Sequence, residues 1–294
     1  MRDVFRFSRS KLRVSAAGLF LITWAPAALA GPAMPSNSDL LTNSGAITNG
    51  HLSVTESEGP LLIGGNFNGG QNVGFNGAPM HPAASSLSGY GAINVYGTAS
   101  AYSNTNGTVH IGANSGSGVF QNAPDKNSAY GYSFPYGFSS LYTQMSSLSM
   151  GLSQLASISS DIGNVISAAP KTVNGVAGVA VVTITGAQLA SLNTNVDHGI
   201  NLNGASLLGI NVDTADGITS FNNNFNANGA GYTSDVLWNY DDAAGNLSFA
   251  REFGGTVLAT AANVSMGGNI DGMIVANSLY SNSELHYEGL DQPG

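Results

Sequence analysis

Hydrophobic positions along most of the chain fall in short runs, and glycine or asparagine turns separate these runs. Short Val/Ile/Leu runs between such turns indicate β-strands. Strands are predicted at 45–48, 51–55, 60–67, 92–96, 107–112, 176–185, 198–202, 206–212, 236–239, 247–249, 256–258, 263–266 and 273–276. Turns are predicted at 64–70 and 103–107, and a polar loop at 214–232. The spacing between runs is irregular, so we expect no regular solenoid with a short consensus.

A different pattern lies between the two sets of strands. Apolar residues recur there at three- and four-residue steps: Phe138, Leu141, Tyr142, Met145, Leu148, Leu152 and Leu155. This period predicts one long amphipathic helix over 135–159, with Pro135 in its first turn. The opposite side of the helix is rich in Ser, Thr and Gln, so one apolar stripe needs a partner. The strands are the only candidate, and we expect one domain with the helix docked along its sheets.

Composition supports a mainly β protein. The chain contains 39 glycines, which supply the positive φ angles that tight turns need. It contains no cysteine, so burial and backbone hydrogen bonds must stabilise it without disulfides. With 43% hydrophobic residues it can bury a sizeable core. A β-rich repeat or sandwich protein fits this composition better than a helical bundle.

The first thirty residues have the features of an export signal. Five basic residues accompany an apolar run at 14–25, and Ala28–Ala30 forms an A-x-A cleavage site. We expect cleavage near Ala30, secretion or surface display, a loose N-terminus over 31–39, a β domain over 40–290 and a short tail over 291–294. No later run is long and apolar enough to predict a transmembrane helix in the mature chain.

Cleavage would change the charge of the protein. The mature chain would keep three basic residues, Lys126, Lys171 and Arg251, and sixteen acidic residues, for a net charge of −13. Such a surface would repel nucleic acid, because it lacks a cationic patch that could release counterions from phosphate. It favours cations or neutral polar partners such as glycans.

Several sequence motifs resemble the choice-of-anchor A family of bacterial surface and secreted proteins. The matching segments are V-L-W-N-Y (236–240), G-T-V-L-A (255–259), A-A-N-V (261–264), N-I-D-G-M-I-V-A-N-S-L (269–279), S-E-L-H (283–286) and E-G-P-L-L-I-G-G-N-F (58–67). The resemblance covers about Ser38 to Leu290. It implies a β-helix-like, adhesin-type domain, with the amphipathic helix alongside and no known catalytic residues. No sorting motif follows Leu290, so we expect release or non-covalent retention.

Few residues suggest chemistry. On a strand, Glu284 and His286 would share one face, where a metal or acid–base role is conceivable. No H-x-x-x-H spacing exists among His51, His81, His110, His198 and His286. We favour a structural role for the pair.

Calcium is the one cofactor that the sequence brings into question. Asp213 with Asp216 and Gly217, and Asp241 with Asp242, could offer carboxylate oxygens on turns. Neither group matches a known calcium loop, and aspartates at turns mostly bond to the backbone. We therefore favour capping and assign no metal-binding residue.

Catalysis has even less support. Glu56 and Glu58 could form a carboxylate pair for glycoside hydrolysis, but sequence alone cannot place them across a cleft. No G-x-S-x-G motif occurs, and the glycine loop at Gly64 lacks the lysine of a phosphate loop, so we interpret it as a turn. We assign no catalytic or cofactor-binding residue.

Tyrosines are frequent in the first half of the chain: Tyr90, Tyr96, Tyr102, Tyr130, Tyr132 and Tyr136. If exposed they could stack on sugar rings, but we favour packing roles for them. Our leading interpretation is a non-enzymatic adhesin that binds a glycan or surface polymer through a flat polar face. Two alternatives stay open. One is an ice-binding protein, for which Val182–Thr185 hints at a threonine array, and the other is a polysaccharide-active enzyme.

Overall fold

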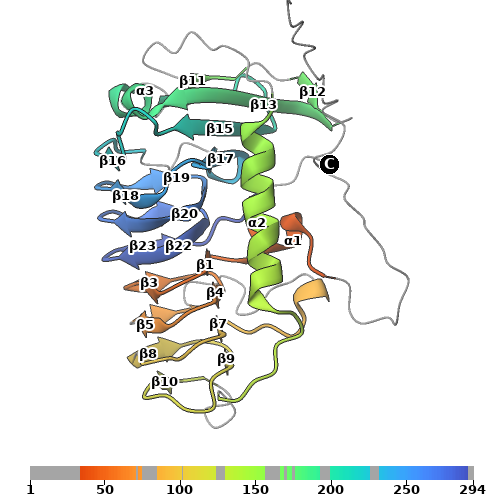
Figure 1. Ribbon diagram of the computed structural model, residues 1–294, viewed down its shortest axis with the longest axis vertical. Coiled ribbons are helices and arrows are strands. Elements are labelled where there is room, and N and C mark those ends of the chain that lie inside the picture. The colour runs from red at the N-terminus through yellow and green to blue at the C-terminus, as the bar shows by residue number, and fades with distance from the viewer. Residues whose placement is uncertain are drawn as a thin grey trace, which may run out of the picture.

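The protein is an elongated β-solenoid with one long helix along its side, as Figure 1 shows. The computed structural model describes residues 34–70, 72–74, 85–100, 102–123, 130–155, 166–168, 171–173, 176–192, 199–225 and 232–290. Among these residues, every pair of strands is parallel except β12 with β13. The predicted mainly β, solenoid-like architecture with a helix alongside is therefore confirmed.

Strands stack on three faces of the rod. The helix face contains β12 (Lys171–Val173), β13 (Val176–Thr185), β15 (Leu207–Asp213), β17 (Val236–Asn239), the first half of β20 (Thr256–Met266), the first half of β22 (Ile274–Ser281), β1 (Ala46–Thr48), β4 (Leu61–Ile63), β7 (Ile93–Val95) and β9 (Val109–Ile111). The open face contains β16 (Ser220–Phe221), β18 (Gly245–Phe249), the second halves of β20 and β22, β2 (Leu52–Ser53) and β5 (Phe67–Gly69).

The third face is the carboxylate face. It contains β19 (Phe253–Gly254), β21 (Ile270–Asp271), β23 (Glu284–His286), β3 (Glu56–Ser57), β6 (Asn72–Val73), β8 (Tyr102–Thr105) and β10 (Val119–Gln121). A small separate sheet pairs β11 (Ile166–Ser167) with β14 (Ile200–Asn201). The described helices are α1 (Asn37–Asn43), α2 (Phe138–Ser153) and α3 (Gly186–Ser191).

The order of strands in space differs from their order in the sequence. β1 lies between β4 and β22, and β23 lies between β3 and β21. The chain thus enters the middle of the rod and builds toward β9 and β10. Helix α2 spans back along the rod, and the later strands return from β13 to the middle (Figure 1). The first and last strands meet at a seam made by β1 with β22 and β3 with β23.

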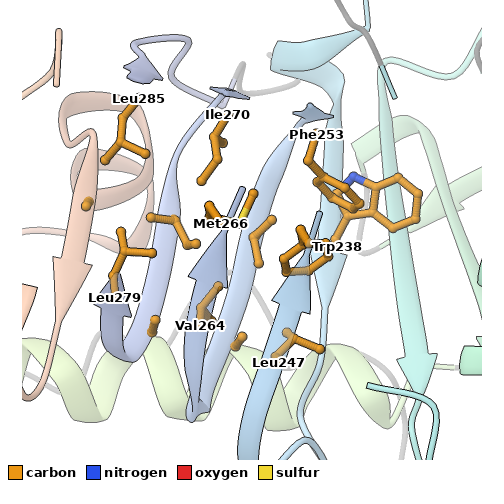
Figure 2. Packing of buried hydrophobic residues seen from close by; sticks show 14 of the residues in the cluster. Trp238, Leu247, Phe253, Val264, Met266, Ile270, Leu279 and Leu285 are labelled. Atoms are coloured by element: carbon orange, nitrogen blue, oxygen red, sulfur yellow. The ribbon is translucent and has the colours of Figure 1, made fainter. Parts of the chain in front are cut away.

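Apolar side chains fill the interior in columns along the rod axis. Leu247, Val264 and Leu279 occupy matching positions on the open-face strands, and Phe253, Ile270 and Leu285 match on the carboxylate face (Figure 2). Trp238 is fully buried in this core. Its indole N–H donates to the Gly254 carbonyl at 2.9 Å. Buried and outward residues alternate in the second half of β20 on the open face, whereas β1, β4, β7 and β17 on the helix face are buried throughout.

Helix α2 packs its apolar stripe on the helix face. Leu141 and Met145 are fully buried there, against Leu237 and Leu258 among others. The helix begins at Phe138, with Gly137 as N-cap, so the prediction that Pro135 lies in its first turn is wrong. It ends at Ser153, and the predicted residues 156–159 lie outside the described part of the chain.

Two buried asparagines fix the second half of α2 to the sheet. Asn239 Nδ2 donates to the Ser149 carbonyl at 2.9 Å and to Asn211 Oδ1 at 2.8 Å. Asn211 Nδ2 donates to the Leu152 carbonyl at 3.0 Å, and Ser149 Oγ donates to Asn239 Oδ1 at 2.6 Å. Buried amides are stable only when paired in this way. Ser149 is 1% exposed and lies within the buried stripe, so the stripe includes one polar residue that bonds to the sheet.

The Gly-Gly-Asn segment forms a corner between two faces, and β5 begins directly after it. A Cβ at Gly64 would lie 2.5 Å from the Phe138 ring, and a Cβ at Gly65 would lie 2.5 Å from the Gly50 carbonyl oxygen. Only glycine allows this approach of the helix and of the neighbouring coil. Asn66 Oδ1 accepts from Thr98 N at 3.0 Å and from its hydroxyl at 2.8 Å. The turn predicted over 64–70 is corrected, because its last part is a strand.

Other elements also differ from the prediction. The turn predicted at 103–107 is wrong, because β8 occupies Tyr102–Thr105, and 256–258 and 263–266 belong to one bent strand, β20. The loose N-terminus predicted to residue 39 is corrected from Asn37 onward. Helix α1 starts there, and a capping box between Ser36 and Asp39 stabilises it. Ser36 and, three residues later, Asp39 form a capping signal that is visible in the sequence, but the prediction relied on the hydrophobic pattern alone.

None of the helices in the described ranges has both the length and the apolar character needed to span a membrane.

Candidate binding surface

Two rows of outward side chains run along the open face, one residue per coil in each row. Strand register aligns Asn246 with Asn263 and then with Ser278, and the same row continues through His51, Asn66 and Thr98. The second row contains Ser220, Ser248, Ser265, Tyr280 and Ser53. After a register shift at which Ser53 pairs with Gly69, it continues through Asn68 and Ser100. From β18 to the coil of Ala99, each coil thus presents a polar–apolar–polar triplet with the apolar residue buried, whereas in the β16 coil the exposed Ile218 aligns with Asn246.

These rows differ from the rest of the molecule in charge. Neither row, as described, contains Asp, Glu, Lys or Arg, although the whole chain has a net charge of −9. His51 is the one titratable imidazole in them. A flat run of uncharged amides and hydroxyls can donate and accept hydrogen bonds without attracting ions.

A depression of 470 Å³ lies in the middle of the open face. It is lined by His51, Ser53, Asn68, Asn246, Asn263, Val264, Ser265, Ser278, Leu279 and Tyr280. Tyr280 is 53% exposed and stands between Ser265 and Ser53 in its row. Since both neighbours are small, much of the phenol ring is exposed beside the depression.

Side-chain contacts orient the amide of Asn263 in this depression. Asn277 Nδ2 donates to Asn263 Oδ1 at 2.9 Å, and Asn49 Nδ2 donates to Asn277 Oδ1 at 3.2 Å. The Asn263 oxygen therefore accepts one hydrogen bond, which orients its amide. His51 N donates to Ser278 Oγ at 3.2 Å, which ties β2 to β22 beside it.

The carboxylate face holds the predicted Glu284–His286 pair. His286 Nδ1 lies 2.5 Å from Asp271 Oδ1, and His286 Nε2 lies 2.9 Å from Glu284 Oε2. Burial alone would lower the pKa of His286, but hydrogen bonds to Glu284 and Asp271 outweigh burial and raise it. Asp271 was not singled out from the sequence, because strand pairing brings it to β23 from fifteen residues away. His286 thus joins β23 to β21 beside the seam, and the structural role that we favour for the pair stays a prediction.

The aspartates considered for calcium bond to backbone groups. Asp216 accepts from Ala187 N at 2.8 Å and Ile218 N at 2.9 Å. Asp213 accepts from Ala215 N at 2.9 Å, and Asp242 accepts from Thr214 N at 3.0 Å. Asp241 lies exposed beside them. In the part of the chain that the structure describes, no three His, Asp or Glu residues gather as a metal would require.

The other acidic candidates lie on the outside of the carboxylate face. Glu56 accepts from Asn72 Nδ2 at 3.3 Å, and Glu58 accepts from Tyr287 N at 3.0 Å. The Glu56 position pairs in register with Glu284. These carboxylates bond to the strands around them, and the depression lies on a different face.

Most of the tyrosines considered for sugar binding pack against other groups. Tyr96 stacks on Phe134 at 3.9 Å between ring centroids, and Tyr90 and Tyr96 share a hydrogen bond of 2.9 Å. Tyr132 stacks on His110 at 3.8 Å. Tyr130 and Tyr136 are half-buried, and Tyr102 is exposed at the β10 end of the carboxylate face. His81 and His198 lie outside the described residues.

A polar binding face was predicted from the sequence, but the residues that form the open face were not assigned, although a signal for them exists. The triplets N-L-S (246–248), N-V-S (263–265), S-L-Y (278–280), H-L-S (51–53) and N-F-N (66–68) all place one apolar residue between two polar ones. Their uneven spacing hides them from a search for a fixed period. Tyr280, the aromatic residue of the depression, lies in β22 directly after the motif at 269–279. It was not among the tyrosines considered from the sequence.

Fold and surface together define a β-solenoid with an extended, uncharged face. The chain belongs to the family described as "Putative Ice-binding-like adhesive domain", whose model matches residues 40–287. Membership of this family therefore supports an adhesive or ice-binding-like domain. No curated protein matches the chain.

Three solved structures are similar to the chain. One is an ice-binding protein from the Antarctic ascomycete Antarctomyces psychrotrophicus, with 11% identity over 87% of this chain and 98% of that chain and a TM-score of 0.32. Another is the DUF3494 domain of an ice-binding protein from Shewanella frigidimarina, with 13% identity over 90% and 100% of the two chains and a TM-score of 0.30. An ice-binding protein from an Antarctic bacterium of the Flavobacteriaceae shares 13% identity over 83% and 64%, with a TM-score of 0.28.

Proposed function

We propose that this protein is an exported, non-enzymatic adhesive module that holds an extended uncharged surface through its open face. One observation carries the proposal: two continuous rows of amide and hydroxyl side chains, without a charged residue, cross a strongly acidic molecule. Many weak hydrogen bonds along such rows would add up only on a surface that is itself extended.

Ice is the first surface to test. The sequence ranked a glycan or surface polymer first and ice second, but the family description supports ice at least as well. The rows repeat at the strand spacing of about 4.8 Å, which offers a regular array to an ordered surface. The threonine array hinted at by Val182–Thr185 does not contribute, because Thr185 caps α3 and β13 lies on the helix face.

A neutral glycan is the second candidate. The depression and the exposed ring of Tyr280 favour it, because a flat crystal surface would not fill a hollow beside a raised aromatic side chain. The polysaccharide-active enzyme considered from sequence has no observation in its favour.

A labelled mature chain tests the adhesive face directly. We expect it to be enriched in slowly grown ice or to show thermal hysteresis, and we expect Ser248→Arg to reduce the bound fraction about tenfold, because an arginine on the row holds the surface away. Gln121→Arg adds the same charge on the carboxylate face and serves as control. Equal retention of the two variants, on ice and on insoluble neutral glycans alike, would refute the proposal.

Export and domain boundaries complete the proposal. We infer a signal peptide over 1–30, a β domain over 40–290 and a short tail over 291–294, within the choice-of-anchor A group that the motifs resemble. N-terminal sequencing of the protein recovered from the medium or cell surface of an expressing bacterium should begin at Gly31. A mature N-terminus at Met1 would contradict the predicted signal peptide.

A further inference from the structure

We propose that the depression on the open face is a subsite for a neutral pyranose ring of a polysaccharide, with Tyr280 as its stacking platform. This inference rests on the proposed function, since it assumes that the open face is the adhesive one. It goes further by assigning a ligand class and individual residues to one place on that face.

The position of the depression suits a polymer. It crosses β18, β20, β22, β2 and β5, so five neighbouring coils contribute to it. Its residues lie on strands that run across the rod. The second row continues beyond it on both sides, to Ser220 and Ser100, and the first row continues on one side, to Asn66 and Thr98. Five strands about 4.8 Å apart span about 19 Å. A chain of sugars that follows the rod axis would therefore stack one ring on Tyr280 and place neighbouring rings in the rest of the depression and along the rows.

Tyr280 supplies the aromatic surface. The side chain is 53% exposed, and the residues aligned with it on the adjacent strands are Ser265 and Ser53. Strands lie about 4.8 Å apart, so small neighbours leave open space beside the ring. An exposed phenol offers an apolar face to the C–H groups of a sugar and a hydroxyl at its tip.

The amides supply directional hydrogen bonds. Asn263 is oriented by Asn277, so that its oxygen accepts one hydrogen bond and its N–H groups point away from that contact. Asn246 and Asn68 are exposed and line the same depression. Side-chain amides combine donors and acceptors, and sugar hydroxyls need both.

Charge restricts the ligand class further. Every residue that lines the depression is uncharged or a histidine. No cation is present among them to pair with a uronate, sulfate or phosphate, and the acidic chain would repel such groups at long range. The subsite therefore fits neutral sugars and disfavours acidic ones.

Titration with soluble hexasaccharides tests the subsite. Cellohexaose, laminarihexaose, mannohexaose and N-acetylchitohexaose are the neutral probes, and hexagalacturonate is the acidic one. We expect at least one neutral probe to bind and the acidic one not to bind. Tyr280→Ala should weaken that binding about tenfold through loss of stacking, whereas Tyr280→Phe keeps the ring and should change it less than about threefold.

A matched pair of charge variants tests the amide role. Asn263→Asp keeps the oxygen that accepts from Asn277 but loses the N–H donors, and we expect about tenfold weaker binding. Asn104→Asp on the carboxylate face keeps the oxygen that accepts from Asn122 at 2.7 Å and adds the same charge away from the open face, so binding should stay within about twofold.

The outcomes separate the two proposals. If Ser248→Arg lowers surface retention but no hexasaccharide binds at about 10 mM, where millimolar affinity would fill most sites, the adhesive face stands and the subsite is refuted. The subsite is refuted as well if the acidic probe binds as tightly as a neutral one, or if Tyr280→Ala binds like wild type. If no variant of the open face changes retention, both proposals fail.

Discussion

At the scale of single residues, His286 on β23 contacts Asp271 on β21 and Glu284 on its own strand, next to the seam. A protonated imidazole donates to both carboxylates, whereas a neutral imidazole can donate to only one. Glu58 also faces this ring and favours its charged form. The pKa of His286 is therefore raised above its usual value of about 6.5.

This shift predicts how stability depends on pH. Because the folded pKa lies above the unfolded one, the stabilising contribution is complete below about pH 6.5 and is lost as pH rises through the folded pKa. His286→Gln should lower the melting temperature more at about pH 6 than at about pH 9. Burial also raises the pKa of Glu288, and the charge on His286 opposes that rise, so the variant changes both groups and its effect belongs to the His286 cluster as a whole.

His51→Gln is the control for this experiment, because His51 is exposed on the open face. Thermal unfolding followed by circular dichroism measures both variants. An equal loss for His286→Gln at the two pH values would contradict the role of the charged imidazole.

At the scale of elements, helix α2 is joined to the solenoid by an apolar stripe and by the buried amides of Asn211 and Asn239. The stripe could be predicted from sequence, because its three- and four-residue period does not depend on which partner covers it. The amides could not, since an asparagine in a strand gives no sign of which backbone carbonyl it will meet. The helix start also escaped prediction, because Pro135 fits a first turn yet the chain around it still packs as an extended aromatic segment.

Loss of the Asn239 amide should destabilise the protein strongly. Asn239→Ala leaves the Ser149 hydroxyl and the Asn211 oxygen buried without this partner, at a cost of about 3 kcal/mol in the free energy of unfolding. Chemical denaturation measures this loss. Asn246→Ala, an exposed asparagine on β18, should change the value by less than about 0.5 kcal/mol, and similar losses for both variants would contradict the assigned role.

Truncation of the apolar stripe gives a second prediction at this scale. Met145→Ala removes a fully buried side chain and should cost about 2–5 kcal/mol. Thr143→Ala, on the exposed side of the same helix, should be neutral or slightly stabilising because alanine favours helix. Denaturation midpoints that fall equally in both variants would show that the helix does not depend on the sheet contact.

At the scale of the whole molecule, the solenoid is continuous in space but divided in sequence. Strands 176–185 and 236–239 were predicted with their correct bounds, and the mainly β fold with one helix followed from composition, pattern and motif resemblance. The two-residue strands and the pairing of β1 with β22 were beyond prediction. Parallel pairing between distant segments leaves no periodic trace when coil lengths vary.

The seam predicts the effect of losing the last strand. A chain ending at Ser283 would lack β23 and would expose the edges of β3 and β21, which would otherwise pair with it. We expect a lower melting temperature and concentration-dependent association, because unpaired edges seek other strands. A chain ending at Leu290 keeps β23 and is the control, and size-exclusion chromatography with thermal melts compares the two. Monodisperse, fully stable behaviour of the shorter chain would refute this prediction.

Entry of the chain at the seam also decides how the rod bears mechanical load. Helix α1 lies beside the middle of the rod (Figure 1), and Leu290 N donates to the carbonyl of Leu41 on this helix at 3.3 Å. Force applied through α1 or Leu290 would therefore be carried first by α1 and the seam strands. A tether attached there would hold the rod at its middle, so that its faces stay free to lie against a surface.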